Sequence, residues 1–353
     1  MIKYQIAVVY NAEHHKYSGN YGFIRYSRRL IKTIFHLRQQ TVTLQVTFLI
    51  TKLPFMKQFF AMVSPRLLLL LCLFFGIRHM DAAAANHYSF AVKKEGRGTP
   101  LIFLPGAYCS GAVWDETVAH YKKNYTCYQI TLPGFGGQPP IQSDSLLNTV
   151  VHELADFIRE NKLQKPVIVG HSLGGWLALQ LGIRYPDLPG KLICVSSGPF
   201  LPAFFMGAHV TPDSTRAMAL EMKKQMSAPT PAHVKSGQQR MLASMITDAR
   251  NIKKVADMAA TADGPTQGTV MYELYTTDLR DLIHLIRCPI LVLADWAGYK
   301  DYGATRTSVL ENYQLQYKQA PQTIIAMNDQ AKHFIMLDQP VWFFHQVDSF
   351  LRP

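Results

Sequence analysis

The feature that most constrains this chain is a glycine-flanked serine between a predicted strand and a predicted helix. Residues 167–170 form a short apolar run typical of a buried strand, and Gly170-His171-Ser172-Leu173-Gly174 follows directly. A serine on so sharp a turn has strained backbone angles, and the flanking glycines remove the side-chain carbons that would block it. We therefore expect the hydroxyl of Ser172 at a sheet edge, beside a helix N-terminus that favours developing negative charge.

Short apolar runs alternate with amphipathic segments through residues 86–353, a pattern that predicts a mostly parallel, doubly wound α/β sheet. The runs show no polar alternation, as expected for strands covered on both faces. The predicted strands are Leu101–Leu104, Thr126–Leu132, Val167–Gly170, Leu192–Val195, Ile290–Leu293 and Thr323–Met327. The predicted helices are Val113–Lys123, Leu146–Asn161, Gly175–Arg184, Ser308–Gln319 and Pro340–Leu351.

One connection is much longer than a simple crossover. More than 90 residues separate Val195 from Ile290, and this stretch is helical in pattern and holds eight of the 14 methionines. It predicts a helical cap over residues 198–278, inserted into a core formed by 86–197 and 279–353. The methionines either fill helix cores or form an adaptable apolar wall over a substrate pocket.

The region before the core has the order of a secretory signal. Residues 67–77 are an unbroken apolar run of 11, too short for the roughly 20 residues that cross a bilayer. Lys57 and Arg66 precede the run, and Ala83–Ala85 offers a cleavage site of the A-x-A type. We expect a signal peptide over residues 56–85.

Several consequences follow from this signal. The mature protein would begin near Asn86, be secreted or periplasmic, and have no stable membrane span. Residues 1–55 are then a disordered extension or the product of a start codon placed too early. The alternative is a genuine basic extension followed by a short anchor.

Charge argues against nucleic acid as a partner. The chain carries 36 Lys and Arg against 24 Asp and Glu, a formal charge of +12. Residues 1–85 hold 11 of the basic and 2 of the acidic residues, which leaves 25 against 22 for the rest. Nucleic-acid binding needs a basic stripe on the folded domain itself, and this domain is nearly neutral.

Cysteine and glycine patterns predict neither a metal nor a cofactor. Four cysteines follow residue 85 and allow three pairings, among which the sequence does not choose. Cys194 and Cys288 lie in or beside apolar runs, where buried free thiols are expected. There is no CxxC, no Cys/His pair at zinc spacing and no Gly-rich phosphate loop.

Through Gly170-x-Ser172-x-Gly174 the chain resembles the α/β-hydrolase superfamily, and the resemblance covers residues 88–353. Leu104-Pro105-Gly106-Ala107 resembles that family's oxyanion-hole loop, with Pro105 where a histidine is usual. Other similar segments are Leu132–Gly136, with Thr131 where an aspartate is common, Asp278–Leu293, Ala331–Phe334 and Asp338–Pro340.

The resemblance implies a catalytic triad in the chain order serine, acid, histidine. Ser172 would be the nucleophile and His333 its base, with His345 as the nearest rival for the base; His171 is expected to pack or to hydrogen-bond locally. Gly298-Tyr-Lys-Asp301 has the family's Gly-x-x-Asp form, so Asp301 is the favoured acid. The other candidates are Asp295, which is second, and then Asp278 and Asp281.

An oxyanion hole completes the implied site. Its donors would be the backbone N–H groups of Ala107 and Leu173. Because the donors are backbone groups, Pro105 does not by itself abolish the hole, but the family's anchor for this loop is missing.

Three functions remain open. The expected partner is a small-molecule ester or amide substrate, and the oligomeric state is open as well. The first is a secreted serine hydrolase that cleaves a carboxylic ester through an acyl-serine. The second is an N-terminal peptidase or amidase with the same triad, which needs an acidic cap residue to hold the amine. The third is a non-catalytic binding protein. The acidic cap candidates are Glu221, Asp248, Asp257 and Glu273.

Overall fold

The computed structural model describes residues 88–143, 145–227 and 241–352. Backbone contacts divide the chain into residues 1–84 and 85–353, and every described residue belongs to the second unit. The predicted extension over 1–55 and signal peptide over 56–85 lie outside the described residues and stay predictions. Within the described ranges, no helix combines the length and the apolar character that crossing a bilayer requires.

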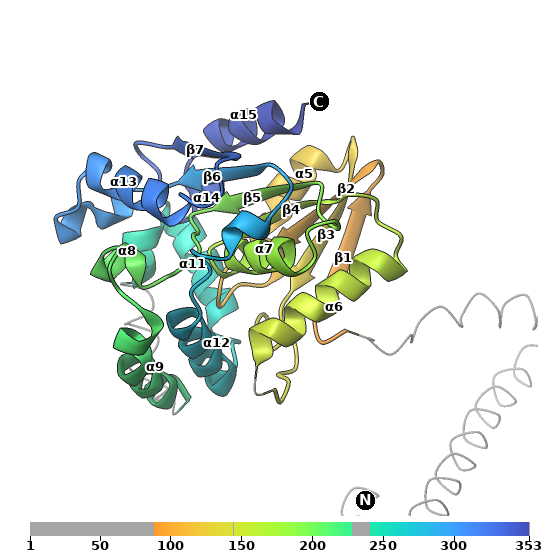
Figure 1. The fold of residues 1–353 in the computed structure, drawn as a ribbon. Coiled ribbons are helices and arrows are strands. Elements are labelled where there is room, and N and C mark those ends of the chain that lie inside the picture. Colours follow the sequence, from red (N-terminus) through yellow and green to blue (C-terminus); the bar gives the residue numbers. More distant parts are fainter. Residues whose placement is uncertain (1–87, 144, 228–240, 353) are drawn as a thin grey trace, which may run out of the picture. The chain divides into compact units, whose positions relative to one another are not determined.

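A seven-stranded sheet organises the described residues, in the order β1-β3-β2-β4-β5-β6-β7 (Figure 1). All neighbouring pairs are parallel except β1 and β3. The strands are β1 (Ala91–Gly96), β2 (Thr99–Leu104), β3 (Tyr125–Thr131), β4 (Val167–His171), β5 (Lys191–Val195), β6 (Ile290–Ala294) and β7 (Thr323–Met327). Six of them match the predicted strands, which confirms the mostly parallel α/β sheet.

The sequence reading missed β1, the antiparallel edge strand. Its residues, AVKKEG, pair with β3 in the register Ala91↔Thr131, and most of them are exposed or half-buried. β1 carries no continuous apolar run, and such a run is the signal that predicts the other six strands, including the half-buried edge strand β7.

Helices cover both faces of the sheet. One face packs on α6 (Leu146–Glu160), α7 (Leu173–Arg184) and α13 (Arg306–Gln316). The other packs on α5 (Asp115–Tyr121), α14 (Ile335–Asp338) and α15 (Pro340–Leu351). Alternate residues of β4 divide between the two cores, since Ile168 belongs to the first and Val169 to the second. This is the doubly wound arrangement that the apolar strands predicted.

The long connection between β5 and β6 is helical. It contains α8 (Ala203–Met206), α9 (Pro212–Ser227), α11 (Ala249–Ala259) and α12 (Gly264–Thr276). Helices α9 and α12 lie side by side at the lower left in Figure 1, whereas α11 packs with the core on the second face of the sheet. The exact limits of the cap, 198–278, stay a prediction. Met271 of this segment packs against the core, as expected for a methionine that fills a helix core, whereas Met206 is exposed. The alternative of an apolar wall over a substrate pocket stays a prediction.

A half-buried carboxylate connects this helical segment to α6. Glu273 on α12 accepts hydrogen bonds from the backbone N–H groups of Leu146 (2.7 Å) and Leu147 (3.0 Å). These groups lie in the first turn of α6, where a helix has no backbone partners of its own. Burial raises the pKa of Glu273, and the two hydrogen bonds oppose that rise. Glu273 therefore acts as a helix cap supplied from a distant part of the chain.

Replacing Glu273 with alanine is expected to destabilise the protein by about 1–3 kcal/mol, because two buried N–H groups lose their acceptor. Urea denaturation at constant pH measures this loss. Glu221→Ala is the matched control, since Glu221 is an exposed carboxylate on α9 that accepts one hydrogen bond from Gln225. We expect the control to change the free energy of unfolding by less than about 0.5 kcal/mol. Equal effects of the two variants would contradict the capping role.

Candidate active site

Ser172 occupies the turn between β4 and α7 with φ 51° and ψ −114°. A positive φ is rare for a residue with a side chain and persists only when its surroundings hold it. Here the N–H of Ser172 donates to the carbonyl of Val195 (2.9 Å). The carbonyl of Ser172 accepts from the N–H of Gly175 (3.0 Å) and from the hydroxyl of Ser197 (2.7 Å). The backbone of the turn is therefore fixed, and the half-buried side chain is left to project from it.

The two flanking glycines are required by close backbone contacts. A Cβ on Gly170 would lie 2.1 Å from the carbonyl oxygen of Gly174, and a Cβ on Gly174 would lie 2.2 Å from that of Leu104. No side chain fits at such distances. The Gly-x-Ser-x-Gly pattern is thus a packing requirement of β4, α7 and the end of β2.

The site lies at a topological switch point of the sheet. The chain runs from β2 to β3 on one side and then returns to β4 on the other side of β2. In open α/β sheets, ligands bind in the crevice that such a reversal leaves at the carboxyl ends of the strands. The segment after β2 reaches Ser172 there, because a Cβ on Gly106 would lie 3.4 Å from the Cβ of Ser172.

Both predicted oxyanion donors belong to segments next to Ser172. Ala107 follows Gly106, and the turn is closed by a hydrogen bond from the N–H of Cys109 to the carbonyl of Gly106 (3.2 Å). Leu173 is the first residue of α7, and the first N–H groups of a helix have no partner within the helix. The arrangement can present two N–H groups to one oxygen bound at Ser172.

His333 follows β7 and is paired with a carboxylate from the end of β6. Its Nδ1 lies 3.8 Å from Oδ2 of Asp295, and Asp295 is almost completely buried. Oδ2 has no hydrogen-bond partner among the described residues, so it is available to the imidazole. Such contacts are often long in the absence of substrate and tighten when it binds.

A buried tyrosine holds the other oxygen of Asp295. The hydroxyl of Tyr313 on α13 donates to Oδ1 at 3.0 Å. Burial and the nearby Asp295 raise the pKa of Tyr313 well above its ordinary value, so the hydroxyl keeps the proton that it donates. The sequence reading did not single out Tyr313, because helical periodicity shows only that it is buried.

The structure does not bring Asp301, the favoured acid, to His333. After β6 the chain coils into the 3-10 helix η3 (Ala297–Tyr302), which leaves Asp301 exposed. The Gly-x-x-Asp form on which Asp301 was favoured therefore lies within this 3-10 helix. Asp295, the second choice, occupies the place beside Nδ1. Asp278 pairs instead with Arg280 (2.6 Å), and Asp281 is exposed.

The two other histidines near the motifs have different surroundings. His345 is exposed on α15, so the structure does not place it as a rival for the base. His171 is completely buried, and its Nε2 lies 3.0 Å from the backbone carbonyl of His333. Burial lowers the pKa of His171 well below its ordinary value, and the neighbouring His333 adds to this effect. The hydrogen bond expected of His171 thus goes to the backbone of His333, which is near in space but distant in the sequence.

The remaining thiols and potential ligands give no second reactive centre within the described ranges. Cys109, Cys127, Cys194 and Cys288 are all free and buried. Burial raises the pKa of Cys109 and of Cys194 to about 12, which keeps both protonated. Among residues 88–143, 145–227 and 241–352, no group of three His, Cys, Asp or Glu side chains is placed to hold a metal ion.

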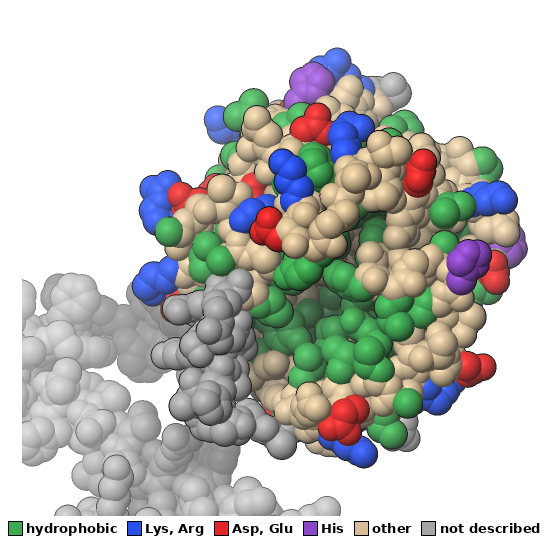
Figure 2. Space-filling model, turned by 90° about the vertical axis from the view of Figure 1, so that its left-hand side faces the viewer, with side chains coloured by type: hydrophobic (Ala, Val, Ile, Leu, Met, Phe, Trp, Pro, Cys, Tyr) green, Lys and Arg blue, Asp and Glu red, His purple; other side chains and the backbone are tan. Residues whose placement is uncertain are grey.

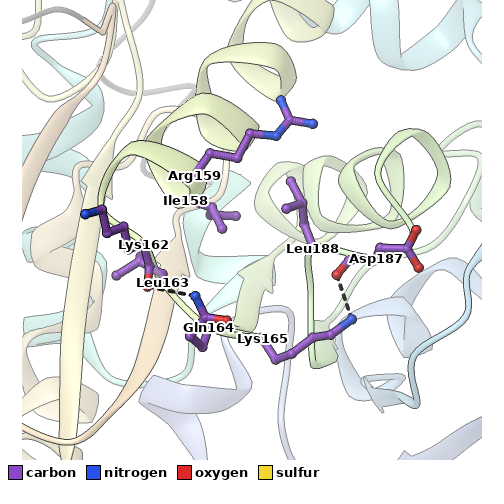
Figure 3. Close-up of a pocket in the computed structure, with 8 residues that line it drawn as sticks. All are labelled: Ile158, Arg159, Lys162, Leu163, Gln164, Lys165, Asp187 and Leu188. Atoms are coloured by element: carbon purple, nitrogen blue, oxygen red, sulfur yellow. Dashed lines mark hydrogen bonds between the residues drawn. The ribbon is translucent and has the colours of Figure 1, made fainter.

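A hollow with largely hydrophobic walls opens on the side of the molecule where α8 and α9 lie (Figure 2). A different pocket, of about 270 Å³, lies between the end of α6 and the turn before β5 (Figure 3). Its residues include Lys165, whose ammonium donates to the carbonyl of Asp187 (2.6 Å). This pocket is at the amino ends of β4 and β5, whereas Ser172 follows the carboxyl end of β4. It is therefore separate from the candidate active site.

Comparisons with known proteins agree with this geometry. The model of the alpha/beta hydrolase family matches residues 101–346. A pimeloyl-[acyl-carrier protein] methyl ester esterase from Vibrio vulnificus is 25% identical over 256 residues, which is 72% of this chain and 95% of that protein. Another of the same name, from Aeromonas salmonicida, is 34% identical over 112 residues, or 31% of this chain and 42% of that protein.

Solved structures show the same fold at lower identity. MenH from S. aureus superposes with a TM-score of 0.61 at 15% identity, over 74% of this chain and 97% of that one. A thermophilic esterase from Thermogutta terrifontis gives 0.58 at 21% identity, over 74% and 93%. The family model alone covers well over half of the sequence, and with the sheet order and the serine turn it leads to one conclusion: the chain belongs to the alpha/beta hydrolase family.

Proposed function

We propose that this hydrolase cleaves a carboxylic ester through an acyl-serine intermediate, with Ser172, His333 and Asp295 as its triad. The observation that carries the proposal is the strained, backbone-fixed Ser172 directly after His171, whose ring lies 4.8 Å from that of His333, the partner of Asp295. A serine hydroxyl is a weak nucleophile until a positioned base accepts its proton. A buried carboxylate beside that base orients the imidazole and stabilises its cation.

The proposed reaction has two steps. The hydroxyl of Ser172 attacks the ester carbonyl while the free nitrogen of His333 accepts the proton, and the N–H groups of Ala107 and Leu173 stabilise the oxyanion. His333 then returns the proton to the departing alcohol, which leaves the acyl group on Ser172. A water molecule, deprotonated by His333, attacks the acyl-serine and releases the carboxylic acid and the free serine.

An ester fits the surroundings better than a peptide N-terminus. An amine-binding site needs an acidic cap residue that faces the ligand, and each of the four candidates is engaged elsewhere. Glu273 caps α6, and Glu221 is exposed and accepts from Gln225. Asp248 caps α11, and Asp257 pairs with Lys253 (2.6 Å). The curated relatives named above are pimeloyl-[acyl-carrier protein] methyl ester esterases, which also favours an ester.

A panel of p-nitrophenyl esters of rising acyl length, run beside aminoacyl-p-nitroanilides, tests this proposal. We expect ester turnover that varies with acyl length, and anilide turnover lower by at least tenfold. Anilide turnover equal to or above ester turnover would favour the peptidase alternative. Turnover of neither series, with no acylation of Ser172, would favour a binding protein of this fold.

We also propose that the protein is exported and that its signal is cleaved after Ala85. The support is the order of Lys57, the apolar run 67–77 and Ala83–Ala85. N-terminal sequencing of protein isolated from its native source should begin at Asn86 or within a residue or two of it. Cytoplasmic protein that retains residues 1–55 would contradict both the export and the early-start interpretation.

A further inference from the structure

We propose that His171, the residue before the nucleophile, is a positioning residue that holds the His333 loop and the oxyanion loop in register with Ser172. The inference rests on the proposed triad and adds to it a fourth side chain that touches neither substrate nor the reacting atoms. His171 is the last residue of β4, so its backbone is continuous with the serine turn. Its imidazole reaches the other two segments of the site.

The first contact fixes the catalytic histidine. Nε2 of His171 lies 3.0 Å from the backbone carbonyl of His333, and a carbonyl only accepts, so Nε2 carries the proton and donates. The two imidazole rings lie 4.8 Å apart, and the ring of Phe334 is 4.4 Å from that of His171. The hydrogen bond therefore acts on the backbone of the very residue whose side chain is the base.

The second contact supports the oxyanion loop. A Cβ on Gly106 would lie 2.7 Å from Nδ1 and 3.1 Å from Cε1 of His171, so the imidazole packs edge-on against the backbone of this glycine. Pro105 precedes it and has no N–H with which to anchor the loop. Ala107, the proposed oxyanion donor, comes next. The imidazole of His171 therefore packs against Gly106, the residue that immediately precedes this donor.

These contacts require one neutral tautomer. With the proton on Nε2, Nδ1 is a lone pair that is buried and has no hydrogen-bond partner among the described residues. A second proton would place an N–H against Gly106 with no acceptor, in a site where burial already disfavours charge. The titratable groups that face this site are His333 and, behind it, Asp295. His171 therefore stays neutral while His333 takes up and releases the catalytic proton.

Other hydrogen bonds fix the backbone of the residues on either side of His333. The N–H of Phe334 donates to the carbonyl of Met245 (3.3 Å), and the N–H of Lys332 donates to Asp338 (3.0 Å). Loss of the His171 bond should consequently leave the loop in place and loosen the residue between these two anchors. A misplacement of about 1 Å is enough to cost on the order of 10²-fold in rate.

Two variants test whether the hydrogen bond to His333, and not simply a polar side chain at position 171, is required. The amide nitrogen of His171→Gln stands near the position of Nε2 and can donate to His333, whereas the shorter amide of His171→Asn cannot reach it. We expect kcat for the best ester to fall about 10²-fold in His171→Asn and less than about tenfold in His171→Gln, with KM within threefold of wild type in both. The acid limb of the pH profile of kcat/KM should move in His171→Asn only.

Val150→Ala controls for lost stability, because Val150 is buried on α6, an element that carries none of the proposed site residues. A comparable loss of kcat in Val150→Ala at equal melting temperature, or equal kcat in the Gln and Asn variants, would overturn the positioning role. Nitrogen-15 NMR of histidines in the wild-type protein gives a readout that does not depend on turnover. It should show His171 as the Nε2–H tautomer, without titration between about pH 5 and 9; an Nδ1–H tautomer or titration in that range would overturn the proposal even if the ester assay failed.

Discussion

Replacing Ser172 with alanine should lower kcat for ester hydrolysis by about 10⁶-fold, the loss typical of removing the nucleophile from an intact triad. The turn that carries Ser172 is held by backbone bonds to Val195 and Gly175, so the variant keeps its fold while it loses the attacking oxygen. The same variant should lose covalent labelling by a fluorophosphonate probe. Residual hydrolysis of about 10³–10⁴-fold over water would come from binding and the oxyanion hole.

Ser197→Ala is the control for this experiment. Ser197 follows β5, and its hydroxyl donates to the carbonyl of Ser172 (2.7 Å), so it contacts the same turn from another segment and acts as a structural donor. We expect this variant to keep fluorophosphonate labelling and to lose no more than about tenfold in kcat, the cost of one hydrogen bond. Labelling that persists in Ser172→Ala, or that disappears in Ser197→Ala, would contradict the assignment of the nucleophile.

The parts of the fold that the sequence predicted are those whose signal is local. The central strands β4, β5 and β6 are short apolar runs because both faces of the sheet are covered there, and the Gly-x-Ser-x-Gly turn is marked by its glycines. The edge strand β1 is half exposed and has no such run. Its pairing with β3 depends on residues about 35 positions away, and periodicity within one window does not contain that information.

The candidate site shows the same difference between residues with a local sequence signal and residues placed by tertiary packing. Ser172 and His333 were predicted from motifs and stay predictions, whereas the position of the acid depends on how the chain continues after β6. The Gly-x-x-Asp form favoured Asp301, but the turn into η3 leaves that residue exposed, and Asp295 lies beside His333. The parts played by Tyr313 and His171 could not be read from the sequence, because a hydrogen-bond partner on another element is a property of tertiary packing.

Replacing Asp295 with asparagine should lower kcat by about 10⁴-fold, the loss known for the corresponding change in a serine protease, while the variant stays folded. The side-chain amide keeps the volume of the carboxylate, but an amide nitrogen facing Nδ1 stabilises the wrong tautomer of His333. It also removes the negative charge that stabilises the imidazolium in the transition state. Steady-state kinetics with the best ester of the panel measures the loss, and circular dichroism verifies the fold.

Two further variants serve as comparisons for the loss of kcat in Asp295→Asn: Asp301→Asn tests the rival acid, and Tyr313→Phe tests the hydrogen bond to Oδ1. Asp301 is exposed on η3, so its variant should change kcat by less than about threefold, within the range of surface substitutions. Tyr313→Phe removes the hydrogen bond to Oδ1 and leaves the charge in place, so we expect an intermediate loss of about tenfold. A large loss in Asp301→Asn together with a small one in Asp295→Asn would return the role to Asp301, and it would require the segment after β6 to uncoil when substrate binds. If both variants keep nearly full activity, the acid comes from elsewhere, and the buried Asp295–Tyr313 pair then serves only to join β6 to α13.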